Sequence, residues 1–166
     1  MARILEREGL RIVGVGDFAP ELLAPVGRIA GGAPDDDAQA DIVFGAALLA
    51  ALSPYDVGQG VVVARKRALA IEAAEGTDAM LARVADLRAK GRLRFKGRAG
   101  VFVKAAKRGQ DLRFDLPAIG LATLAAAGRA ELKGVAVAAG QTLIADRAAF
   151  AAAAADAGLF VVGFAT

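Results

Sequence analysis

The chain has 166 residues, of which 56% are hydrophobic, and this length suits one domain with one buried core. Lysine and arginine total 21 against 18 aspartate and glutamate, so the net charge of +3 is too small to indicate a nucleic-acid partner. The absence of cysteine and histidine excludes thiol nucleophiles, imidazole bases, disulfides and the usual zinc and copper sites. Any metal must be held by oxygen, which favours Mg²⁺ or Mn²⁺.

Neither a secretory signal nor a membrane-spanning segment is expected. Residues 1–14 carry charges throughout their middle, unlike a signal peptide. No apolar run approaches the roughly 18 residues that are needed to span a bilayer. We therefore expect a cytoplasmic protein in which residues 1–166 form a single domain.

Short apolar runs alternate with helical stretches along the chain. Strands are predicted at 10–15, 60–64, 68–73, 101–105, 134–138 and 159–164. Because most of these runs are apolar throughout, the strands should be buried on both faces. This predicts an α/β fold, a single layered domain with a largely parallel or mixed sheet flanked by helices.

Four helices are predicted between these strands, at 36–52, 77–90, 116–130 and 147–157. A residue suited to N-capping stands at or just before the start of each helix, namely Asp35, Thr77, Asp115 and Asp146. Gly91 and Gly158 follow the ends of two of them, as C-terminal glycines commonly do.

Basic residues gather between Lys90 and Arg113. A solvated loop and a face for anionic ligands explain this cluster equally well. Its glycine-punctuated part, residues 89–100, is long enough to serve as a lid over a ligand.

One candidate site lies at the end of the predicted strand 68–73. Two carboxylates, Glu72 and Glu75, are followed by Gly76, Thr77 and Asp78 at the start of a helix. The free N–H groups of a helix's first turn attract an anion, and either glutamate could hold a metal or orient water. Simple capping by Thr77 explains the same residues.

A second candidate site follows the predicted strand 101–105. Lys104, Lys107 and Arg113 can neutralise phosphate oxygens. Asp111, beside Gln110, can ligate a divalent ion that polarises phosphorus or acidifies water. Asp115, which precedes Leu-Pro, also suits a helix N-cap. The residues alone predict a domain that binds a phosphorylated ligand, and leave open whether it hydrolyses that ligand.

Four runs occur together in this chain, DVGQ at 56–59, EAAEGTDAML at 72–81, KAAKRGQDLRFDLP at 104–117 and GLFVVG at 158–163. With them the chain resembles the LpxI family of UDP-2,3-diacylglucosamine pyrophosphatases of lipid A synthesis, over nearly its whole length. The resemblance implies Mg²⁺-dependent hydrolysis to UMP and 2,3-diacylglucosamine 1-phosphate (lipid X), with water attacking the phosphorus next to the sugar.

The resemblance also implies roles for individual residues. Asp111 is the expected catalytic, metal-linked acid with Asp115 in reserve, and Glu72 is the second expected metal ligand. The expected substrate-binding residues are Gln59, Glu75, Gly76, Thr77, Asp78, Lys104, Lys107, Gln110 and Arg113.

Family members carry an additional N-terminal domain, which we expect this chain to lack. The alternative function is therefore a truncated phosphate- or nucleotide-binding domain without catalytic activity of its own. The resemblance further implies a homodimer, and the acyl chains of a lipid-linked UDP-sugar imply peripheral contact with the inner face of the inner membrane.

Overall fold

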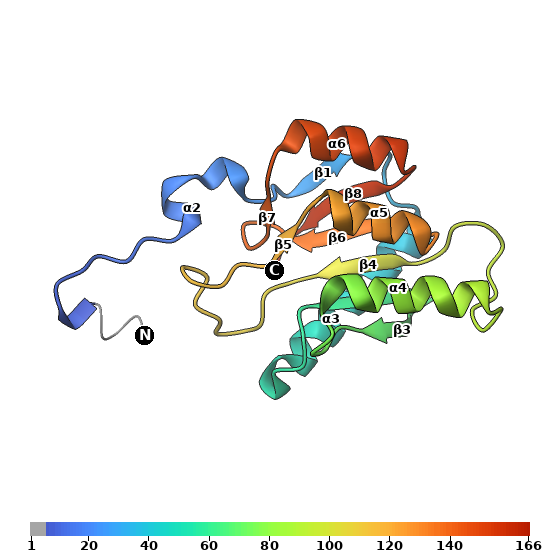
Figure 1. The fold of residues 1–166 in the computed structure, drawn as a ribbon, viewed down its shortest axis with the longest axis horizontal. Coiled ribbons are helices and arrows are strands. Elements are labelled where there is room, and N and C mark those ends of the chain that lie inside the picture. The colour runs from blue at the N-terminus through green and yellow to red at the C-terminus, as the bar shows by residue number, and fades with distance from the viewer. Residues whose placement is uncertain (1–5) are drawn as a thin grey trace.

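The computed structural model describes residues 6–166, which fold around a six-stranded sheet of order β1-β8-β6-β4-β2-β3 (Figure 1). The strands are β1 (Gly27–Ala30), β2 (Gly60–Ala64), β3 (Arg67–Ile71), β4 (Val101–Lys104), β6 (Gly134–Ala138) and β8 (Phe160–Phe164). β4, β6 and β8 run parallel, whereas β1, β2 and β3 pair antiparallel with their neighbours. The predicted α/β fold is confirmed, and the sheet is mixed.

Helices cover both faces of this sheet. The long helices are α3 (Asp36–Leu52), α4 (Gly76–Ala89), α5 (Leu121–Arg129) and α6 (Arg147–Asp156). α4, α5 and α6 lie on one face and α3 on the other (Figure 1). The β4–α5–β6 and β6–α6–β8 connections both move toward β8 along the sheet. Because connections between parallel strands are almost always right-handed, α5 and α6 lie on the same face.

Short elements complete the described chain. They are α2 (Val15–Phe18), the 3₁₀ turns η1 (Pro20–Leu22) and η2 (Ser53–Tyr55), and a two-stranded ribbon of β5 (Ala118–Ile119) and β7 (Leu143–Ile144).

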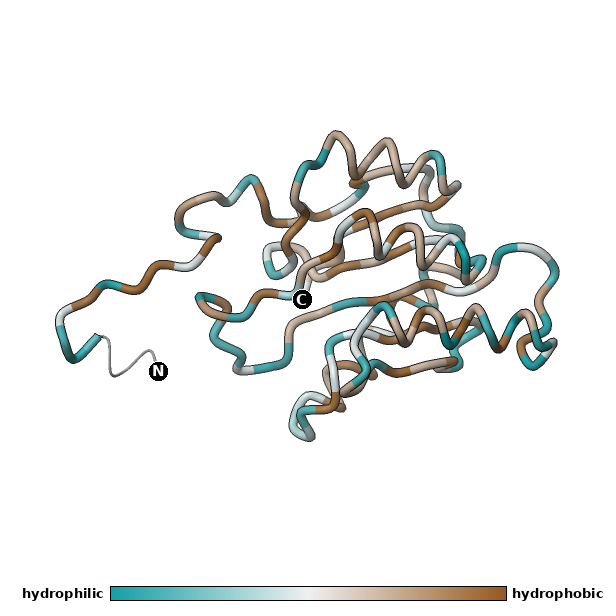
Figure 2. Tube along the Cα trace, viewed as in Figure 1, coloured by the Kyte–Doolittle hydropathy of each residue, from teal (hydrophilic) through white to brown (hydrophobic). Residues whose placement is uncertain are grey.

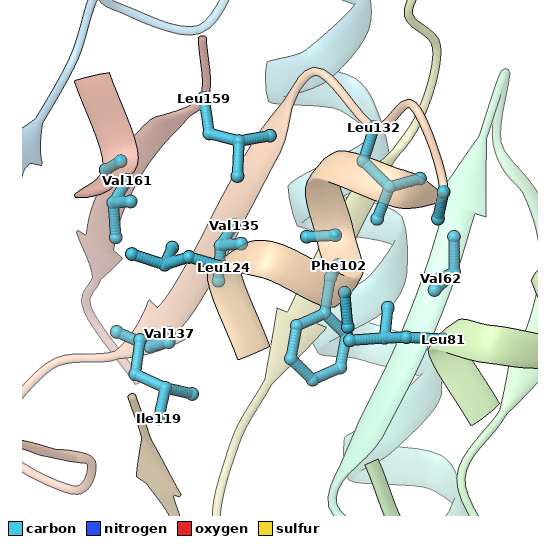
Figure 3. Close-up of a cluster of buried hydrophobic side chains, with 14 of the residues drawn as sticks. Val62, Leu81, Phe102, Ile119, Leu124, Leu132, Val135, Val137, Leu159 and Val161 are labelled. Atoms are coloured by element: carbon cyan, nitrogen blue, oxygen red, sulfur yellow. The ribbon is translucent and has the colours of Figure 1, made fainter. Parts of the chain in front are cut away.

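The main core lies between the sheet and helices α4 to α6. Phe102 of β4, Leu81 of α4 and Leu124 of α5 are buried there together (Figure 3). On the other face α3 lies very close to the sheet at Gly45, where an added Cβ would stand 2.7 Å from a methyl carbon of Val103. The apolar strands thus occupy the centre, and hydrophilic segments lie at both ends of β4 (Figure 2).

The prediction of a strand at 10–15 is wrong. These residues are mostly extended without pairing, and α2 begins at Val15. Leu10 and Val13 remain 57% and 50% exposed, and no strand among residues 6–166 pairs with this run. The sequence reading also missed β1, a four-residue edge strand that has only one buried residue and so gives little apolar signal.

Two of the four predicted N-caps are wrong, and the caps at Asp35 and Asp146 are confirmed. α4 begins at Gly76, and the hydroxyl of Thr77 donates to Glu72 instead of capping. α5 begins at Leu121, because residues 118–119 pair with β7 and Gly120 takes the cap position. Asp115 therefore lies in a loop.

One continuous helical stretch, residues 36–55, is long and apolar enough to cross a membrane, with a mean hydropathy of 1.3. The expectation that no run approaches this length is therefore wrong. In the structure this stretch packs on the sheet through Ile42, Gly45 and Leu49. Only 28% of its apolar window is buried, but a single such helix is weak evidence for a membrane span, because core helices pass the same test of length and composition.

Candidate active site

The two sequence-predicted sites meet at one edge of the sheet. β2 begins at Gly60 opposite Lys104, the last residue of β4, and β3 ends at Ile71 beside the start of β2. Glu72 follows β3 at the same edge, and Thr77 stands in the first turn of α4. Open α/β sheets bind ligands at the carboxyl ends of their parallel strands, and β4 ends here.

Lys104, Thr77 and Glu72 form a buried chain of polar contacts. The ammonium Nζ of Lys104 donates to Thr77 Oγ1 at 2.7 Å, and this hydroxyl donates to Glu72 Oε1 at 2.9 Å. Nζ also lies 3.7 Å from Glu72 Oε2, an ion pair whose side chains are only 7% and 13% exposed. Glu72 Oε2 has no hydrogen-bond partner, although it is buried.

The buried ammonium of Lys104 is poorly hydrated, which favours binding of an anion. Burial lowers the pKa of Lys104, because the charged form loses its hydration, while Glu72, Asp78 and Asp115 oppose the shift. Asp78 and Asp115 therefore lie close enough to Lys104 to act on its charge. A phosphate oxygen that reached this poorly hydrated cation would be bound strongly.

Two glycines allow Glu72 to approach the start of β2. A Cβ on Gly60 would stand 2.5 Å from Glu72 Oε2, and one on Gly58 would stand 2.1 Å from the Glu72 carbonyl oxygen. Sequence reasoning assigned no role to these glycines. The only signal was their spacing on either side of Gln59.

Gln110 ties the loop after β4 to the same edge. Its Oε1 accepts from Gln59 Nε2 at 2.8 Å and from the N–H of Lys107 at 3.1 Å. Its Nε2 donates to the carbonyl oxygen of Asp115 at 2.6 Å. The Lys107 ammonium itself pairs with Asp56. The amides of Gln59 and Gln110 thus organise the loop that carries Asp115.

Asp111 and Arg113 contact each other. The guanidinium donates from Nε to Asp111 Oδ1 at 2.9 Å and from Nη2 to Oδ2 at 2.7 Å, and its Nη1 donates to Glu6 at 2.7 Å. These bonds lower the pKa of Asp111, and they raise the pKa of Arg113. The roles predicted for both residues stay predictions, and Asp111 would have to leave Arg113 to bind a metal.

The remaining predicted residues surround the start of α4. Glu75, the residue before α4, pairs with Arg83 of that helix at 2.9 Å. Gly76 has φ +78°, a left-handed conformation that favours glycine, and apart from its chain neighbours and its own helix no atom lies within 4 Å of where its Cβ would stand. The space beside Gly76, at the start of α4, is therefore open.

A metal would have to be held by few carboxylates. Among residues 6–166 no group of three or more acidic side chains is arranged to hold an ion. Mg²⁺ commonly needs only one or two carboxylates, with substrate phosphates and water as its other ligands. Asp78 and Asp115 are exposed and act on Lys104, and neither makes an ion pair in the described part of the chain. These oxygens fit a hard divalent ion.

A mostly apolar cavity of about 400 Å³ lies beside the loop, between Lys107 and Gln110 on one side and Ala46 and Phe164 on the other. A second cavity of about 640 Å³ shares Ala46 and Phe164 and continues between α3 and β1.

The predicted basic cluster does not form one surface. β4 separates its two halves, so that Lys104 to Arg113 lie at the candidate site and residues 89–100 lie at the opposite end (Figure 1). The latter loop is attached to the turn before β6, where the N–H of Ala99 donates to the Glu131 carbonyl and that of Lys133 donates to Gly100. It cannot cover the candidate site, so its predicted role as a lid is wrong.

Two comparisons with known proteins give matches over most of the chain. The family model described as the LpxI C-terminal domain matches residues 25–162. A relative from Caulobacter vibrioides, named UDP-2,3-diacylglucosamine pyrophosphatase LpxI, is 46% identical over 158 residues. The match covers 95% of this chain and 56% of the relative, so the chain spans about half the length of the curated relative.

Proposed function

The chain belongs to the LpxI family, and from this premise we propose that it hydrolyses UDP-2,3-diacylglucosamine to UMP and 2,3-diacylglucosamine 1-phosphate in lipid A synthesis. The observation that carries the proposal is the buried Lys104–Thr77–Glu72 chain at the edge of the sheet where β4 ends. It places a poorly hydrated cation beside the open space at the start of α4, as a diphosphate requires.

In the proposed reaction, the water oxygen bonds to the phosphorus next to the sugar. The bond from that phosphorus to the bridging oxygen breaks, and UMP leaves with this oxygen. Such reactions depend mainly on positioning and charge stabilisation. Lys104 and the N–H groups of α4 would bind the phosphate oxygens. Asp115 lies near Lys104 and would take the proton of the water, with Asp111 as the alternative acceptor.

A divalent ion, Mg²⁺ or Mn²⁺, would be held by Asp115 and Asp78, whose carboxylates are exposed beside Lys104. When bound, it would neutralise charge on the diphosphate. Glu72 is engaged with Thr77 and Lys104, and Asp111 with Arg113, so both would have to rearrange before they could bind the ion.

The apolar cavities beside the loop support a lipid-linked substrate. They begin at Lys107 and Gln110, the residue that bonds the carbonyl oxygen of Asp115, and continue along α3 past Ala46. One acyl chain would lie there. Peripheral contact with the inner face of the inner membrane follows if the second chain stays in the bilayer.

The test is UMP release from UDP-2,3-diacylglucosamine by the purified chain, with Mg²⁺, Mn²⁺ or chelator. Lys104→Met should lower the rate about 10²–10³-fold, the usual loss for one electrostatic contact to a transition state. Lys90→Met is the matched control, because Lys90 is exposed and directly follows α4, at the end of the sheet opposite to the candidate site. A folded Lys104→Met protein with the parental rate would refute the proposed site.

The alternative is a domain that binds the substrate's diphosphate without hydrolysing it. It is favoured by the extent of the match, since the chain spans 56% of the relative's length. Tight binding of the substrate without UMP release, weakened by Lys104→Met, would identify this alternative. Asp111→Asn and Asp115→Asn, assayed separately, would show which aspartate is needed for turnover.

A further inference from the structure

A basic groove of about 730 Å³ lies at the end of β4 opposite to the candidate active site. It is formed by the turn between β2 and β3, the end of α4 with the loop that follows, and the turn between α5 and β6. Its lining includes one acidic residue, Glu131, and five cationic residues, Arg65, Arg88, Arg94, Lys96 and Arg129. The cations come from these three segments, and only the fold brings them together.

Two of the guanidinium groups are held on an aromatic ring. The Cζ atoms of Arg65 and Arg88 lie 5.4 Å and 5.5 Å from the centre of the Phe95 ring. Arg88 is 10% exposed, and its Nη2 pairs with Glu131 and donates to the Gly97 carbonyl. Its Nη1 is buried without a hydrogen-bond partner. A fixed guanidinium loses less side-chain entropy when it binds a ligand.

The turn that carries Arg65 is strained. Arg65 and Lys66 have φ of 54° and 57°, a conformation for which tight hairpin turns favour asparagine and glycine. The buried carboxylate of Asp41 holds the turn, accepting from the N–H of Arg65 at 3.1 Å and of Lys66 at 2.6 Å. Strained positions of this kind cluster at functional sites, and here the strain places a cation at the groove.

We propose that this groove binds phosphate groups, supplied either by a lipid headgroup or by a free phosphate or diphosphate. No carboxylate lies within 4 Å of the cationic groups of Arg65, Arg94, Lys96 or Arg129 in the described part of the chain, so these groups can pair with a bound anion. Arginine forks suit phosphate oxygens. Two guanidinium groups occupy the Phe95 ring, which leaves no aromatic surface on which nucleic-acid bases could stack.

The experiment compares two double variants that each remove two positive charges. Lys96→Gln/Arg129→Gln alters the groove, and Arg7→Gln/Arg11→Gln alters exposed cations elsewhere. Both are made in a Lys104→Met background, so that binding at the candidate active site is weakened to the same extent in the two proteins. Calorimetric titration with pyrophosphate tests free phosphates, and co-sedimentation with phosphatidylglycerol against phosphatidylcholine vesicles tests headgroups.

The groove double variant should bind at least one of the two probes about tenfold more weakly, whereas the control should change less than about twofold at physiological ionic strength. Loss with pyrophosphate identifies free phosphates as a source, and loss with vesicles alone identifies headgroups. Equal losses in both double variants, or no binding of either probe, would overturn the proposal. The proposed hydrolysis is independent of this result, because the groove lies at the other end of β4.

Discussion

The buried pair of Lys104 and Glu72 permits a quantitative test of the candidate site. Lys104→Met removes the ammonium and leaves the Glu72 carboxylate, only 13% exposed, without its counter-charge. Removing one partner of a buried pair costs about 3–5 kcal/mol of unfolding free energy. Glu72→Gln should cost about as much, because it leaves the ammonium buried beside a neutral amide. The double variant removes both charges and should lose about 2–3 kcal/mol less than the sum of the two single losses, and this difference is the coupling free energy.

Urea unfolding of the parent, the two single variants and the double variant measures this coupling. The matched control is Lys90 with Asp86, an exposed pair four residues apart on α4 whose side chains are 65% and 53% exposed. Lys90→Met and Asp86→Asn should show a coupling of only about 0.3–0.5 kcal/mol. The reasoning would be refuted if the two couplings were equal, because burial would then have no influence on the Lys104 pair.

Three further predictions concern the scaffold and are measured by urea unfolding. Gly45→Ala should lower the free energy of unfolding by about 1–3 kcal/mol, because the new Cβ would collide with Val103 of β4. The control Gly128→Ala in α5 meets only ordinary contacts and should raise it by up to about 1 kcal/mol. Equal effects of the two substitutions would contradict the close approach of α3. Asp41→Ala leaves two N–H groups of the strained turn without their carboxylate and should cost at least about 2 kcal/mol, with Asp41→Asn costing less. The Lys133 hydrogen bond holds the pKa of Asp35 below its ordinary value of 3.8, so its stabilisation is complete above pH 3.8 and is lost as the pH falls through the lower folded-state pKa. Asp35→Asn should therefore flatten the dependence of stability on pH below 3.8, and an unchanged acid limb would contradict this assignment.

Local patterns along the chain predicted most of the regular structure. The positions of β2, β4, β6 and β8 agree with their apolar runs, and α3 and α6 begin after the aspartates expected to cap them. These signals are local, since a buried strand needs a short apolar run and a helix needs a cap at its first turn. The predictions were wrong where the pairing between strands determined the local structure. Residues 10–15 are mostly apolar but pair with no strand in the part of the chain that the structure describes, and residues 118–119 pair with β7 and delay the start of α5.

For the candidate site, the sequence by itself determined the chemistry available. Without histidine or cysteine, only carboxylates, lysines, arginines, hydroxyls and amides remain for binding a phosphate or a metal. Only the tertiary structure decided which of them meet. The antiparallel pairing of β2 with β3 and β4 brings Glu72 to Lys104, 32 residues apart in sequence, whereas Asp111 contacts Arg113 within its own loop. The same sheet splits one basic stretch between its two ends, because β4 crosses the core within it. Spacing along a chain cannot show such partners, since strand pairing joins residues that are distant in sequence.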